Sequence, residues 1–99
     1  MAELTGKQRR YLRALGHHLT PVLQIGHEGL TSAVVTHANA ELDAHELIKA
    51  KVSESSPLPR HEAASQLASA TRSEVAQVLG RTFLLYKPRA KDPQIVLPR

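Results

Sequence analysis

The chain has 99 residues, and its 13 Lys and Arg against 9 Asp and Glu give a formal net charge of +4. This length fits one domain with a modest core, and the basic balance favours polyanionic partners. The absence of cysteine excludes disulfides and cysteine-ligated metals. Residues 1–7 lack the apolar region of a signal peptide, and no apolar stretch approaches the length of a membrane span. We therefore expect a cytoplasmic protein with no membrane partner.

The first helix is predicted to run from Thr5 to about His17, because Thr5 and Gln8 form a T-x-x-Q capping box. Apolar residues at helical spacing are expected to face the core. They are Leu12, Leu15 and Leu19, with Tyr11 beside them. The other positions carry four cations with no acid among them: Lys7, Arg9, Arg10 and Arg13.

A G-x-x-G loop follows the first predicted strand, which spans residues 22–25. Gly26 and Gly29 allow close backbone approach and positive φ, and Thr31 begins a second helix of about residues 32–44. A loop that opens a helix presents free N–H groups and the positive end of the helix dipole. This arrangement suits a phosphate, although an isolated G-x-x-G is also an ordinary strand-to-helix turn.

The rest of the chain continues the alternation of helix and strand. The predicted elements are a strand at 46–52, a Ser- and Pro-rich loop at 53–59, a helix at 60–71, and strands at 74–79 and 82–86. Gly80 and Arg81 suit a type II′ hairpin between the last two strands. The order α-β-α-β-α-β-β predicts one compact α/β domain, residues 1–88, with a four-stranded mixed sheet packed with helices. A basic tail at 89–99 is expected to carry a short edge strand at 95–97.

Four segments together resemble the YhbY-like family, the stand-alone bacterial form of the CRM (chloroplast RNA splicing and ribosome maturation) domain. The resemblance covers residues 4–87 and lies in residues 4–13, in 21–26 with 29–31, in 45–49, and in 80–82 with 84–86. It implies a fold similar to the C-terminal domain of bacterial translation initiation factor three. It also implies an RNA-binding protein that associates with ribosomal RNA in large-subunit precursors and assists ribosome assembly. Neither enzymatic activity nor a cofactor is implied.

The resemblance also implies that the G-x-x-G loop contacts RNA much as the loop of a KH domain does. The family usually has Lys after the first glycine, where this chain has His27 followed by Glu28. A histidine is mostly uncharged at neutral pH on its reference pKa, and the acid opposes it. The loop is therefore expected to bind through backbone N–H groups, or to leave RNA binding to the basic first helix.

The predicted RNA contacts combine this loop with the basic positions of the chain. They are Lys7, Arg9, Arg10, Arg13, Gly26, His27, Glu28, Gly29, Lys49, Lys51 and Arg81. Each cation also has a structural interpretation, because charge runs often form a solvated helix face and strand lysines protect sheet edges. A monomer that binds RNA is the favoured hypothesis. The alternative is a protein-binding adaptor without direct RNA contact.

No catalytic or metal-binding pattern is present in the sequence. The pairs His45-Glu46 and His61-Glu62 lack the second histidine of H-E-x-x-H, and no Walker, Rossmann or G-x-S-x-G motif occurs. His17 and His18 are adjacent and diverge on a helix. We therefore expect no enzyme, no metal and no cofactor.

Overall fold

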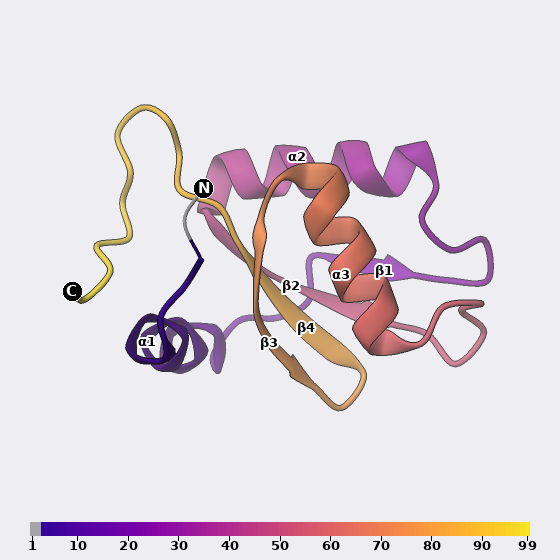
Figure 1. Ribbon diagram of the computed structural model, residues 1–99. Helices are drawn as coiled ribbons and strands as arrows, with labels where there is room; N and C mark the ends of the chain where they lie inside the picture. The colour runs from indigo at the N-terminus through magenta and orange to yellow at the C-terminus, as the bar shows by residue number, and fades with distance from the viewer. Residues whose placement is uncertain (1–2) are drawn as a thin grey trace.

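The computed structural model describes residues 3–99, and its helices and strands follow the predicted order (Figure 1). The elements are α1 Gly6–Gly16, β1 Leu23–Ile25, α2 Ser32–His45, β2 Leu47–Val52, α3 Arg60–Thr71, β3 Glu74–Leu79 and β4 Thr82–Tyr86. This confirms the predicted α/β class. The first two residues of the expected domain, 1–88, lie outside the described part. Within that part, no helix is both long and apolar enough to cross a membrane.

The four strands form one mixed sheet in the order β1-β2-β4-β3. β1 runs parallel to β2, whereas β4 is antiparallel to both of its neighbours. In the turn between β3 and β4, φ is +59° at Gly80 and is not positive at Arg81. A positive φ at the first position alone fits the predicted type II′ turn and not a type I′ turn.

Helices cover the two faces of the sheet unequally. α2 and α3 pack on one face, and α1 lies on the other (Figure 1). β2 shows the resulting alternation, because Ile48, Ala50 and Val52 join the core under α2 and α3. Leu47, Lys49 and Lys51 occupy the alternate positions and therefore face the α1 side.

The prediction that Leu15, Leu19 and Tyr11 face the core is wrong. Leu12 is fully buried, but the other three side chains are 37–40% exposed. α1 approaches the sheet along the line of Leu12 and Gly16, where a Cβ on Gly16 would overlap the Leu84 side chain. Such a narrow contact encloses one line of the helix and leaves its neighbouring apolar positions at the surface.

The expected edge strand at 95–97 is absent from the structure, which shows no regular element after β4. The tail instead folds back over the α1 side, where Ile95 and Leu97 pack against the smaller core cluster. At its end, the carbonyls of Pro98 and Arg99 accept hydrogen bonds from the side chains of Gln8 and Lys7. Side-chain packing and polar contacts thus hold the tail, in place of the strand ladder that its apolar residues suggested.

Candidate nucleic-acid interface

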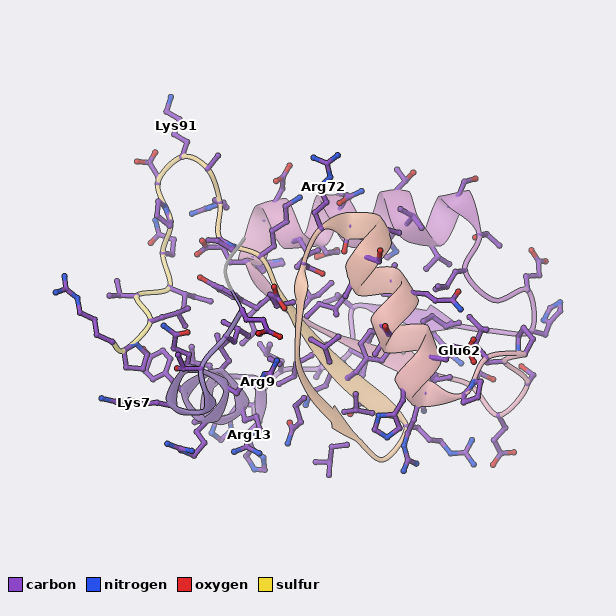
Figure 2. All side chains as sticks on the ribbon, viewed as in Figure 1. Lys7, Arg9, Arg13, Glu62, Arg72 and Lys91 are labelled. Carbon is purple, nitrogen blue, oxygen red and sulfur yellow. The ribbon has the colours of Figure 1, made fainter. Side chains whose placement is uncertain are left out.

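The four cations of α1 lie on different sides of the helix. The predicted capping box is formed, because the Thr5 side chain accepts from the Gln8 N–H and the Gln8 side chain accepts from the Thr5 N–H. Arg9 and Arg13 are one turn apart and project toward the β3–β4 hairpin (Figure 2). Lys7 points the opposite way, toward the C-terminus, and its Nζ donates to the Arg99 carbonyl at 3.3 Å.

Most of the predicted contact cations carry no compensating charge. Within residues 3–99, no Asp or Glu side chain forms an ion pair with Lys7, Arg9, Arg10, Arg13, Lys49 or Lys51. Arg81 differs, because its guanidinium lies 2.6 Å from a carboxylate oxygen of Glu54, and both side chains are largely exposed. The α1 and β2 cations therefore contribute a positive potential that nearby acids do not cancel.

The two β2 lysines connect α1 to the loop end of the sheet. Lys49 is half-buried in a hollow that it shares with Leu15 of α1. Lys51 is exposed, two residues further along the strand, in a second hollow that includes Arg81 and Gln24. The cations thus follow the α1 side of the sheet from the helix toward the β3–β4 turn.

The G-x-x-G loop is a tight turn whose second glycine has a structural role. The Gly29 N–H donates to the Gly26 carbonyl at 3.0 Å, and φ of Gly29 is +70°. Gly29 is buried, and a Cβ there would lie 3.3 Å from Cγ of Pro57. Gly26 has open space in the corresponding direction. Thr31 then caps α2, because its hydroxyl accepts from the Val34 N–H.

The loop tip presents a histidine beside a glutamate and is distant from the basic helix. His27 and Glu28 have side chains 79% and 73% exposed, with a ring nitrogen 3.9 Å from a carboxylate oxygen. The turn between β1 and α2 and the helix α1 lie at opposite ends of the molecule (Figure 1). The structure therefore does not gather all predicted contacts into one patch, and the β2 lysines lie between the two groups.

Glu46 is a buried polar residue to which the sequence assigned no role. It follows α2, has φ of +65°, and is 1% exposed. Its carboxylate accepts backbone N–H groups of the tail at 2.7–2.9 Å, from Arg89 at one oxygen and from Gln94 and Ile95 at the other. Burial raises the pKa of the Glu46 carboxyl, but these hydrogen bonds and the Arg89 charge outweigh it, so the pKa is lowered. The sequence shows no sign of this contact because the partners are backbone groups more than 40 residues away.

The chain is similar over most of its length to one family of known proteins. The model of the CRS1 / YhbY (CRM) domain matches residues 4–87. The chain belongs to the CRM domain family. This confirms the resemblance seen in the four sequence segments.

Relatives of this CRM domain are named for RNA binding. The chain is 39% identical to the probable RNA-binding protein YqeI of Bacillus subtilis, over 96% of this chain and 99% of that protein. It is 34% identical to an RNA-binding protein of Haemophilus influenzae, over 100% of this chain and 99% of the other. A Staphylococcus aureus protein with a solution structure, for which RNA binding has been suggested, matches with a TM-score of 0.82 and 39% identity, covering 96% and 99% of the two chains.

The loop of this CRM domain can be tested by restoring positive charge at its tip. His27→Lys and Glu28→Gln are each expected to tighten RNA binding at low salt by about two- to fivefold, since one surface charge contributes roughly 0.5–1 kcal/mol. Fluorescence anisotropy with a labelled RNA hairpin measures the effect. His37→Lys and Glu41→Gln on α2 are the matched controls and should change affinity less. Unchanged affinity in both loop variants would assign the loop a purely structural role.

Proposed function

We propose that this CRM domain binds RNA through its α1 side. The observation that carries the proposal is the run of unpaired cations from Arg9 and Arg13 along Lys49 to Lys51. Such a run attracts the phosphate backbone of RNA, and the counterions released on binding favour the complex. A surface on which acids neutralise the cations would not gain this affinity. Phosphate contacts of this kind position an RNA without reading its sequence.

Both ends of the molecule take part in the proposed interface. Arg9, Arg10, Arg13 and Lys7 supply charge at one end, and the backbone of the Gly26–Gly29 turn approaches phosphate at the other. Arg81 joins when RNA competes with Glu54 for its guanidinium, because exposed ion pairs are weak. An RNA that reaches both ends must cross β2, where Lys49 and Lys51 lie.

The proposed RNA is ribosomal RNA in precursors of the large subunit, and the proposed role is assistance in ribosome assembly. The resemblance to YhbY-like proteins supports this assignment, and the names of the relatives support RNA binding in general. We further propose that the protein acts in the cytoplasm as a monomer and catalyses no reaction. The described residues contain no cluster of three or more His, Asp or Glu side chains that could hold a metal.

Crosslinking in cells followed by sequencing of the bound RNA tests the proposal. Reads concentrated in ribosomal RNA of large-subunit precursors are expected, and they should decrease when Arg9 and Arg13 are replaced by alanine. A protein adaptor would give a different result, namely a complex with one protein that survives both nuclease and high salt. That outcome, with no enriched RNA, would refute the proposed function.

A further inference from the structure

A hollow of about 390 Å³ opens on the α1 side of the sheet. It lies between the C-terminal half of α1, the segment that leads to β1, the start of β2 and the tail. Its apolar wall is formed by Leu15, Leu19, Val22, Leu47 and Ile95. The volume is within the range of roughly 300–1,000 Å³ that small-ligand sites occupy.

The apolar wall is open to solvent in a protein with few other large exposed apolar side chains. Leu15 is 40% and Leu19 is 37% exposed, although both were expected in the core. Isolated exposed leucines need no explanation, but a concave group of them indicates a binding surface. Glu46 contributes indirectly, because its hydrogen bond to the Ile95 N–H fixes the tail segment that forms one side of the hollow.

The rim of the hollow is polar and positively charged. Lys49 lines it and has no carboxylate partner among residues 3–99. β2 begins further back along the sheet than its parallel neighbour β1. Leu23, the first residue of β1, pairs with Ala50, and before it the Val22 N–H donates to the Lys49 carbonyl. The strand edge at Leu47 and Ile48 therefore lies beyond β1 and borders the hollow.

The hollow combines an apolar wall with a polar, positively charged rim. A nucleotide matches both features, because its base is a flat ring with hydrogen-bonding edges and its phosphate is negatively charged. We propose that the hollow receives one unpaired nucleobase of the bound RNA, with Lys49 contacting its phosphate. The inference rests on the proposed RNA binding and adds the structural class of RNA, one with an extruded base. A peptide strand fits less well, because β2 offers it an edge of only two residues beyond β1.

Two RNA hairpins of identical stem test the proposal, one fully paired and one with a single bulged 2-aminopurine. The protein is expected to bind the bulged hairpin at least about fivefold more tightly, because burying one base adds affinity. The 2-aminopurine fluorescence should change on binding. Leu15→Gln should abolish the preference, and Lys49→Gln should weaken binding of both hairpins. Leu79→Gln on β3 is the matched control, because Leu79 is 64% exposed and lies outside the hollow.

The outcomes separate this inference from the proposed function. Equal affinity for the two hairpins would refute the base site and leave RNA binding intact, and absence of binding to either would refute both. A preference that survives in Leu15→Gln would also refute the base site. If thermal melting shows that Leu15→Gln is unfolded, Leu19→Gln, in the segment between α1 and β1, provides the same test.

Discussion

Replacing Arg9 and Arg13 together by alanine is expected to weaken RNA binding by about tenfold or more near physiological salt. The two side chains share one side of α1 and have no acidic partner among residues 3–99, so their charge is available to phosphate. The slope of log K against log salt should fall by roughly one for each lost contact. Anisotropy titrations of one RNA hairpin at several salt concentrations measure both quantities.

A control must remove the same charge from another part of the molecule. Arg72 and Lys91 project from the C-terminal end of α3 and from the tail, away from α1 (Figure 2). Arg72 has φ of +57°, so asparagine is its best replacement, and Lys91→Ala completes the pair. This variant should retain most of its affinity and salt slope. Equal losses in the two double variants would mean that net charge, and not the α1 surface, attracts the RNA.

The sequence predicted the elements well because their signals are local. The Thr5 capping box and the Gly80-Arg81 turn each depend on residues a few positions apart. The order of helices and strands then restricted the sheet to a mixed arrangement. The family resemblance, carried by four short segments, was confirmed over residues 4–87.

Features that depend on distant contacts were not predictable in this way. Periodicity cannot tell how much of α1 the sheet covers, so Leu15 was placed in the core although it lines an open hollow. The apolar residues 95–97 suggested a strand because the sequence does not show that Glu46 binds the tail backbone. The candidate contacts follow from charge and from the G-x-x-G motif, and their separation between two ends of the molecule appears only in the fold.

Glu46→Gln is expected to destabilise the fold by roughly 2–4 kcal/mol at neutral pH, since a buried carboxylate that accepts three N–H groups is replaced by a neutral amide. One of the two oxygens becomes an NH₂ group, which cannot accept from the tail. Thermal and urea unfolding measure the loss, and trypsin cleavage near Arg89 and Lys91 should accelerate. Glu41→Gln on α2 is the control, because the Glu41 carboxylate pairs with two exposed histidines, His37 and His45.

The stability lost in Glu46→Gln should depend on pH, because the hydrogen bonds to the tail lower the pKa of Glu46 below its ordinary value of 4.5. A lowered pKa stabilises the folded state above pH 4.5, and this contribution disappears as the pH falls through the folded-state pKa. The free energies of unfolding of the parent and Glu46→Gln should therefore differ most near neutral pH and converge in acid. The same convergence should be seen in tail cleavage by a protease active at low pH. A difference that stays constant down to pH 2 would show that the carboxylate charge does not hold the tail.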